Sequence, residues 1–184
     1  MPAEERTSDI ESPPIGTYQY GPVACYPYDP RAPDVARRVA QMITTRLPML
    51  RVDHVGSTSV PGCAGKGIVD LVVIYPDGAL EQAKRVLDDL GFQHQQAGHM
   101  FPETRPMRIG ALRYDGDMFR IHAHVLSEHS PEIDSMRAFR DRLRGDPQLM
   151  AGYVARKYAI ISAGVSEPAE YTRLKSEFFT EAER

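Results

Sequence analysis

The residues best suited to chemistry lie in one short stretch that runs from His54 to Asp70 and reads HVGSTSVPGCAGKGIVD. Its glycines permit main-chain conformations that other residues avoid, and they let a ligand approach the main chain closely. Exposed N–H groups and hydroxyls are natural partners for phosphate oxygens, and a lysine supplies a compensating charge. The stretch therefore predicts a phosphate-binding loop made of Gly56, Ser57, Thr58, Ser59 and Lys66.

The same stretch has a second interpretation as an ordinary turn. Loops rich in Gly, Ser and Pro are common between strands and by themselves indicate only a change of chain direction. Lys66 is followed by Gly67 where the P-loop has Ser or Thr, so the stretch does not match that motif. Asp70 lies near the start of the apolar run that follows, where it is placed to hold a divalent cation.

Two histidines farther along the chain are candidates to act with Asp70. His122 and His124 are two residues apart in an alternating segment, so in a strand both imidazoles lie on one face, together with Arg120. With Asp70 on an adjacent strand they would form a site of two histidines and one carboxylate, which suits a transition metal better than magnesium. Hydrogen-bonded, half-buried histidines, or one histidine acting as a general base, fit the pattern equally well.

The elements that must position these residues are strands around the glycine-rich loop. The apolar residues of segment 68–75 are nearly continuous, which predicts a strand buried on both faces except at Asp70. Segments 107–114 and 118–126 flank an Asp-Gly-Asp turn and predict a hairpin. Further strands are expected at 51–55 and 92–96, and helices from the N-cap Asp34 to Leu47, from 78 to 90, after Ser130-Pro131, after Asp146-Pro147, and from 168 to 179.

This order of elements predicts an α/β or α+β domain, with a β-sheet and a helical C-terminal part. Residues 1–22 are polar and rich in Pro, Gly and Ser, which predicts a flexible tail, and residues 23–184 are expected to form a single domain.

Basic residues of the helical part are candidates for the same cleft. Arg140 and Arg144 lie four residues apart on one helical face, and the forked donors of arginine suit phosphate. Lys157 is a further candidate on the next helix. The plainer interpretation is a solvated face with ion pairs to Asp134 and Asp141.

Composition narrows the classes of partner. The net charge of the 184-residue chain is −3, so neither nucleic acid nor an anionic membrane is an expected partner. No run approaches the ~18–20 apolar residues of a membrane span, and the N-terminal residues lack the apolar stretch of a signal peptide. The two cysteines show no metal-binding spacing. These features predict a cytoplasmic protein with a small-molecule partner and leave the oligomeric state open.

The run HVGSTSVPGCAGKGIVDLVV resembles the signature of the GrpB family, and weaker matches extend over about residues 23 to 180. That family is similar to the nucleotidyltransferase superfold, a mixed β-sheet flanked by helices. There a Gly-Ser pair after the first strand binds triphosphate, and acids on the next strands bind magnesium. The resemblance implies that Gly56 and Ser57 match this pair and that Asp70 matches the first acid. The weaker matches are Tyr28-Asp29-Pro30, His122-Ala123-His124-Val125, the segment 138–144, Tyr153 with Lys157, and Tyr171 with Lys175.

The chain departs from the superfold at the other acids. Val72 stands where the second acid is expected, and the strand expected to bear the third offers His122 and His124. Two metals need several carboxylates to offset their charge and fill their coordination, so the set is incomplete.

Three functions stay open at this point. The first is a nucleotidyltransferase-like enzyme that moves a nucleotidyl or phosphoryl group to a small acceptor with Mg²⁺ or Mn²⁺. Here Asp70 holds the metal, and His122 or His124 supplies the missing ligand or the base. The second is a non-catalytic module that binds a nucleotide or coenzyme A, since GrpB-like domains also occur fused to dephospho-coenzyme A kinase. The third is a transition-metal enzyme with Asp70, His122 and His124 as catalytic metal ligands.

Overall fold

A five-stranded mixed sheet lies at the centre of the computed structural model, which describes residues 12–98 and 100–182, with side chains to Phe178. The strand order is β1-β2-β5-β4-β3. The pair β2–β5 is parallel and the other three pairs are antiparallel, which confirms the predicted mixed sheet. The strands are β1 (Arg51–Val55), β2 (Ile68–Tyr75), β3 (Gln93–His94), β4 (Met107–Tyr114) and β5 (Asp117–Ser127).

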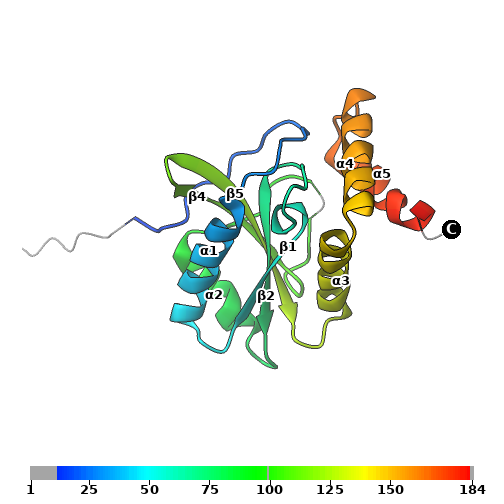
Figure 1. The fold of residues 1–184 in the computed structure, drawn as a ribbon. Coiled ribbons are helices and arrows are strands. Elements are labelled where there is room, and N and C mark those ends of the chain that lie inside the picture. Colours follow the sequence, from blue (N-terminus) through cyan, green and yellow to red (C-terminus); the bar gives the residue numbers. More distant parts are fainter. Residues whose placement is uncertain (1–11, 99, 183–184) are drawn as a thin grey trace, which may run out of the picture.

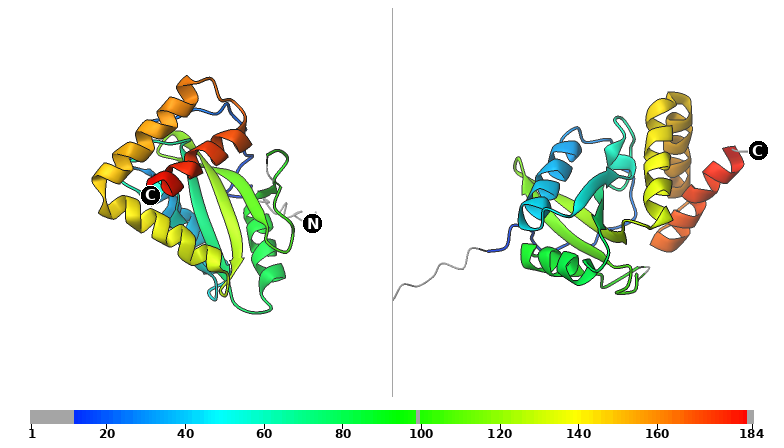
Figure 2. Two further views of the ribbon diagram at one scale, coloured as in Figure 1. Left: turned by 90° about the vertical axis from the view of Figure 1, so that its right-hand side faces the viewer. Right: turned by 90° about the horizontal axis from the view of Figure 1, so that it is seen from below.

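Helices cover both faces of the sheet, so the architecture has three layers (Figure 1). On one face lie α1 (Ala32–Arg46) and α2 (Leu80–Leu90). On the other lie α3 (Pro131–Gly145), α4 (Pro147–Ser162) and α5 (Pro168–Ala182), which form a frame in front of the strands in the left view of Figure 2. No helix in the described part of the chain is long and apolar enough to cross a membrane.

The alternation of β5 divides the two faces as the sequence predicts. Four alternate residues of β5 pack into the core under α1 and α2, namely Phe119, Ile121, Ala123 and Val125. The intervening residues Arg120, His122 and His124 are half-buried on the opposite face. The hairpin before them turns at Asp115 and Gly116, whose φ angles of 48° and 86° match a two-residue turn with two positive φ values.

Strand β2 is buried on both sides, which confirms the prediction from its apolar run. Leu71 and Val73 belong to the core beneath α1 and α2, whereas Val72 and Ile74 pack against Ile133 of α3. Asp70 is the polar exception and stays half-buried.

The start of α1 differs from the prediction. The helix begins at Ala32, two residues before Asp34, and Arg31 occupies the cap position without a side-chain hydrogen bond to the helix N-terminus. Pro33 in the first turn has its φ angle pre-set for a helix. Asp34 therefore lies inside the first turn, where its charge suits the helix dipole and pairs with Arg37 at 2.6 Å. Strand β3 is also shorter than the predicted 92–96.

The predicted starts of α3 and α4 are confirmed. The Ser130 side chain accepts a hydrogen bond from the Glu132 N–H at 3.4 Å. The Asp146 carboxylate accepts from the N–H groups of Gln148 and Leu149 at 3.0 and 2.9 Å.

The N-terminal segment packs on the sheet from residue 12 on. Residues 1–11 of the predicted flexible tail lie outside the described residues. Ile15 is 1% exposed, and Gly16 exchanges two main-chain hydrogen bonds with Ala111 of β4. A Cβ atom at Gly110 would overlap the Ile15 side chain, and one at Gly91 would overlap the Ile15 carbonyl. Gly91 and Gly110 thus leave room for Ile15, which lies in the segment predicted to be a flexible tail.

Candidate functional site

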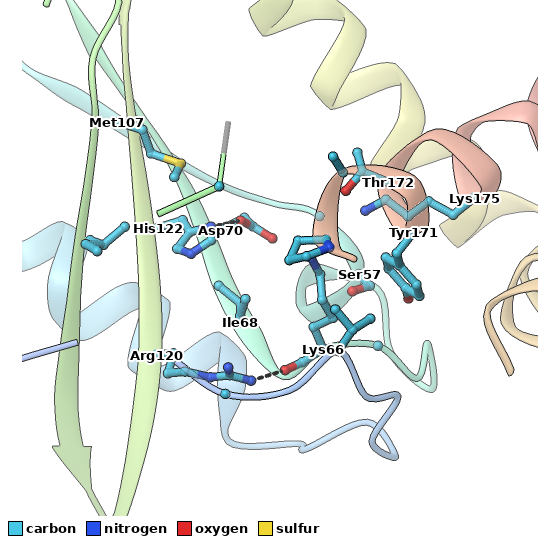
Figure 3. Close-up of a pocket in the computed structure, with 18 of the residues that line it drawn as sticks. Ser57, Lys66, Ile68, Asp70, Met107, Arg120, His122, Tyr171, Thr172 and Lys175 are labelled. Atoms are coloured by element: carbon cyan, nitrogen blue, oxygen red, sulfur yellow. Dashed lines mark hydrogen bonds and ion pairs between the residues drawn. The ribbon is translucent and has the colours of Figure 1, made fainter. Parts of the chain in front are cut away.

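A pocket of about 660 Å³ lies on the sheet face opposite α1 and α2, closed on its far side by α4 and α5. Figure 3 shows Asp70 and His122 on the sheet, Tyr171, Thr172 and Lys175 on α5 across from them, and Ser57 and Lys66 between the two sides. Eight of the predicted site residues line it, namely Gly56, Ser57, Lys66, Asp70, Arg120, His122, His124 and Lys157.

Strand register brings Asp70 and the two histidines together. Asp70 of β2 pairs with His122 of β5, and Val72 pairs with His124, so all four side chains lie on one face. The Oδ1 atom of Asp70 is 3.5 Å from Nδ1 of His122 and 4.0 Å from Nε2 of His124.

Each ring has a hydrogen-bond partner on its far side, and for His124 that partner defines which nitrogen carries the proton. Nδ1 of His124 is 3.3 Å from a guanidinium nitrogen of Arg105, which only donates, so this nitrogen accepts and Nε2–H is directed at Asp70. Nε2 of His122 is 2.9 Å from the hydroxyl of Tyr18. When Tyr18 donates to it, Nδ1–H of His122 is likewise directed at the carboxylate.

The Asp70 carboxylate is therefore held in its ionised form. Burial by itself raises its pKa, but the hydrogen bond from His122 and the charges of the surrounding basic groups outweigh burial and lower the pKa. Burial is the main cause that lowers the pKa of His124 to about 4, opposed by Asp70 and aided by Arg105. His124 is consequently neutral at pH 7.

The donor set does not fit a two-magnesium centre. Such a centre needs several carboxylates, and the described lining of the pocket offers one, Asp70, with the apolar Val72 buried at the second position. The nearby acids Asp53 and Glu132 are each bound by an arginine.

The ligand atoms of Asp70, His122 and His124 do not all lie within 4.8 Å of one another. Within residues 12–98 and 100–182, the one group of three with ligand atoms within 4.8 Å of one another is the exposed set Asp77, Glu128 and His129.

The glycine-rich loop divides into residues that face the pocket and residues that hold the loop. Gly56 has a φ of 71°, and a Cβ atom there would lie 2.6 Å from Oδ2 of Asp70. After it, η1 (Ser57–Ser59) makes one turn of 3₁₀ helix. Ser57 faces the pocket, and its hydroxyl has no hydrogen-bond partner among the described residues.

Thr58 and Ser59, predicted to contact phosphate, instead fasten this turn. The Thr58 hydroxyl donates to the carbonyl of Ile68 at 3.1 Å and lies 3.0 Å from Nε2 of His54. Ser59 donates its hydroxyl to the Gly56 carbonyl at 2.6 Å. Both side chains are buried outside the pocket lining.

Three lysines, here called the lysine cluster, approach the pocket from different elements. They are Lys66 of the loop, Lys157 of α4 and Lys175 of α5. The amines of Lys66 and Lys175 lie 5.2 and 5.7 Å from the ring centre of Tyr171. Lys157 is 2% exposed and donates to the Ala64 carbonyl and, at 3.4 Å, to Cys63 Sγ.

The lysines raise the electrostatic cost of one another's charge. Burial and then the charges of Lys66 and Lys157, opposed by Asp70, set the pKa of Lys175 at about 8. Burial also lowers the pKa of Lys66, with Asp70 opposing and Arg120 adding to the effect. In the described part of the chain, the side-chain amines of Lys66 and Lys175 have neither a hydrogen bond nor an ion pair within 4.0 Å.

The two predicted arginines have different positions. Arg120 lines the pocket and donates to the Lys66 carbonyl at 2.6 Å, which ties the loop to β5. Arg140 lies outside the lining, where it pairs with Asp141 at 2.7 Å and donates to the His54 carbonyl at 3.2 Å. The plainer interpretation of the Arg140 pattern, an ion pair on a helix face, is the one that the geometry matches.

Several lining residues were not predicted as site residues. Tyr171, Thr172 and Lys175 come from α5, and the i, i+4 spacing of Tyr171 and Lys175 was a signal in the sequence that both face one way. Tyr18 and Tyr20 come from the N-terminal segment, which has no periodic pattern that would have indicated them.

Comparisons with known proteins identify relatives along nearly the whole chain. The GrpB protein family matches residues 22–184. The UPF0157 protein BH1888 of Halalkalibacterium halodurans is 32% identical over 156 residues, which cover 84% of this chain and 77% of that protein. The UPF0157 protein PA4798 of Pseudomonas aeruginosa is 32% identical over 155 residues, which cover 82% of this chain and 62% of that protein. A dephospho-CoA kinase of Mycolicibacterium paratuberculosis is 29% identical over 188 residues, 89% of this chain and 46% of the kinase.

Solved structures share the fold. The conserved protein GrpB from Enterococcus faecalis superposes with a TM-score of 0.61 at 21% identity, over 88% of this chain and all of that one. The Cid1 poly(U) polymerase, in its complex with the short product ApU, superposes with a TM-score of 0.52 at 14% identity, over 73% and 42% of the two chains. The protein thus has a nucleotidyltransferase-like fold and belongs to the GrpB family.

Proposed function

We propose that this protein binds a small phosphate-bearing ligand of the nucleotide class in the pocket between the sheet and α5. The observation that carries the proposal is the charge of the lining. Among the described residues it contains five lysines and arginines and one carboxylate, an excess of four positive charges in a chain whose net charge is −3. A concave lining opposite in sign to the whole chain favours an anion.

The state of the lysine cluster supports an anionic ligand. Burial and, after it, the neighbouring like charges destabilise the charged amine of Lys175, as its lowered pKa indicates. Because the amines of Lys66 and Lys175 form no ion pair within 4.0 Å among the described residues, a phosphate group would supply a close counter-charge. The free hydroxyl of Ser57 is a further donor for the same group.

Binding, without two-metal nucleotidyl transfer, is the function that this donor set supports. The lysines take the place that metals hold in neutralising a polyphosphate. Asp70, ionised and oriented by the two histidines, serves as a hydrogen-bond acceptor for a hydroxyl of the ligand. A single carboxylate is too few to hold the two metals of nucleotidyl transfer.

A coenzyme A-related ligand is the second candidate. The specific observation that favours it is the match to the dephospho-CoA kinase, which covers 89% of this chain and 46% of the kinase. Coenzyme A shares an adenine ring and phosphates with the nucleotides, so the same pocket chemistry serves both.

The test is titration calorimetry with ATP on the wild type and on Lys66→Met. Loss of one charged hydrogen bond removes about 1.5–3 kcal/mol, so affinity should fall about tenfold or more. Lys84→Met on α2 is the matched control, because it removes the same charge from the other face of the sheet and should leave affinity unchanged.

Unaltered affinity in folded Lys66→Met would contradict the proposal. So would the absence of binding by the wild type to ATP, inorganic tripolyphosphate and coenzyme A together.

A further inference from the structure

The end of the pocket away from the lysine cluster is aromatic. Its lining includes Tyr18, Tyr20, Phe101, Met107 and Ile109, and it is called here the aromatic end. Tyr18, Met107 and Ile109 form one buried apolar cluster, with Phe101 packed against it. In Figure 3, Met107 lies across the pocket from Tyr171 and Lys175. One cavity therefore joins an apolar lining to a cationic one.

Tyr20 is the exposed ring at this end. Its side chain is 51% exposed, although its hydroxyl accepts a hydrogen bond from the Gln96 N–H at 2.8 Å and its ring packs edge-on against Tyr18 at 5.0 Å. An aromatic ring fixed by a hydrogen bond and a ring contact, yet half open to solvent, is a preorganised surface for another flat ring.

Two residues of the aromatic end precede the part of the chain that matches the family. The family match begins at residue 22, whereas Tyr18 and Tyr20 precede it. The Tyr18 N–H donates to the Gln93 side chain at 2.9 Å, which fixes the segment beside the sheet.

We propose that the aromatic end, whose exposed ring Tyr20 comes from the N-terminal segment, binds the heteroaromatic ring of the ligand, while the lysine cluster binds its phosphates. This inference rests on the proposed function and narrows the ligand to a flat ring joined to phosphate groups, as in a nucleoside polyphosphate. The cavity volume of about 660 Å³ lies within the roughly 300–1,000 Å³ of small-molecule pockets.

The experiment compares ATP with inorganic tripolyphosphate, which carries the phosphates without the ring. Stacking of a base on an aromatic ring is worth about 1–3 kcal/mol, so Tyr20→Ala should weaken ATP binding about fivefold or more. Its affinity for tripolyphosphate should stay within about twofold of the wild type. Tyr20→Phe keeps the ring and should retain ATP binding, and Tyr158→Ala removes an exposed tyrosine of α4 outside the lining as the matched control.

The outcomes separate this inference from the function on which it rests. If Tyr20→Ala binds ATP as well as the wild type does, or loses both probes equally, the ring site is overturned while phosphate binding stands. If the wild type binds neither probe, both proposals fail.

Discussion

Lys175 is the residue whose environment says most about the pocket. It reaches from α5 into a region that already holds two other lysines, and its pKa of about 8 reflects burial first and their charge second. An amine in this state is close to losing its proton in the free protein. A bound phosphate would restore the charge, so ligand binding and proton binding are linked at this side chain.

Affinity for ATP should fall as the pH rises from 7 to 9. At pH 9 the free amine of Lys175 is mostly neutral and must take up a proton before it can bind the phosphate. The affinity at pH 9 should therefore be about tenfold lower than at pH 7. Lys175→Arg keeps its charge and should flatten the profile without loss of binding. Calorimetry in two buffers of different ionisation enthalpy measures the proton uptake. A flat wild-type profile between pH 7 and 9 would contradict the assignment.

The lowered pKa of Lys175 also makes the stability of the folded chain depend on pH. The pKa of Lys175 in the folded chain lies below its ordinary value of 10.5. Between about pH 8 and 10.5 the unfolded chain therefore binds more protons than the folded one, and the contribution of Lys175 to stability rises across that window. Below pH 8 the charged amine is buried at a cost.

At the scale of the element, the glycine-rich loop works because its glycines lie against other parts of the site. Gly56 leaves room for the carboxylate of Asp70, and Gly65 leaves room for the Ser57 hydroxyl, which a Cβ atom would approach to 2.5 Å. The loop and the start of β2 are thus packed against each other. Replacing either glycine by a larger residue would therefore move the side chain of Asp70 or of Ser57, both of which line the pocket.

Gly56→Ala should therefore weaken ATP binding as well as stability. Its φ of 71° costs an alanine about 1 kcal/mol of strain or more, and the added methyl group overlaps Asp70. Gly78→Ala is the control, because its φ of 77° is also positive while nothing lies within 4 Å of the new Cβ atom. Both variants should lose stability in urea denaturation, and Gly56→Ala alone should lose affinity. Equal affinities in the two variants would refute the packing argument.

How well an element could be predicted follows from how local its cause is. The apolar run of β2 and the alternation of β5 are visible in consecutive residues, so the sequence predicts that Asp70, His122 and His124 share a face. The position of residues 12–22 depends on space left by Gly91 and Gly110, which lie far along the chain. No local pattern marks a segment that fits into a gap formed elsewhere.

At the scale of the whole molecule, the pocket lies between two layers, the sheet and the C-terminal helices. The sheet supplies Asp70, the two histidines and Arg120, and the C-terminal helices supply Lys157 and Lys175. The sheet half of the site could be predicted, because strand pairing brings residues 70 and 122 side by side. The helix half depends on how α4 and α5 pack, and their periodicity indicates a buried face without indicating what it covers. For the same reason Arg140, on a helix of similar pattern, lies outside the pocket.

The central claim is that cationic side chains, and not a pair of metal ions, neutralise the phosphates of the ligand. The most direct measurement is the affinity for ATP by calorimetry, first with EDTA and then with added magnesium. The claim predicts binding in EDTA at least as tight as with magnesium, because free ATP presents more negative charge to the lysine cluster. Binding that is absent in EDTA and restored by magnesium would contradict it.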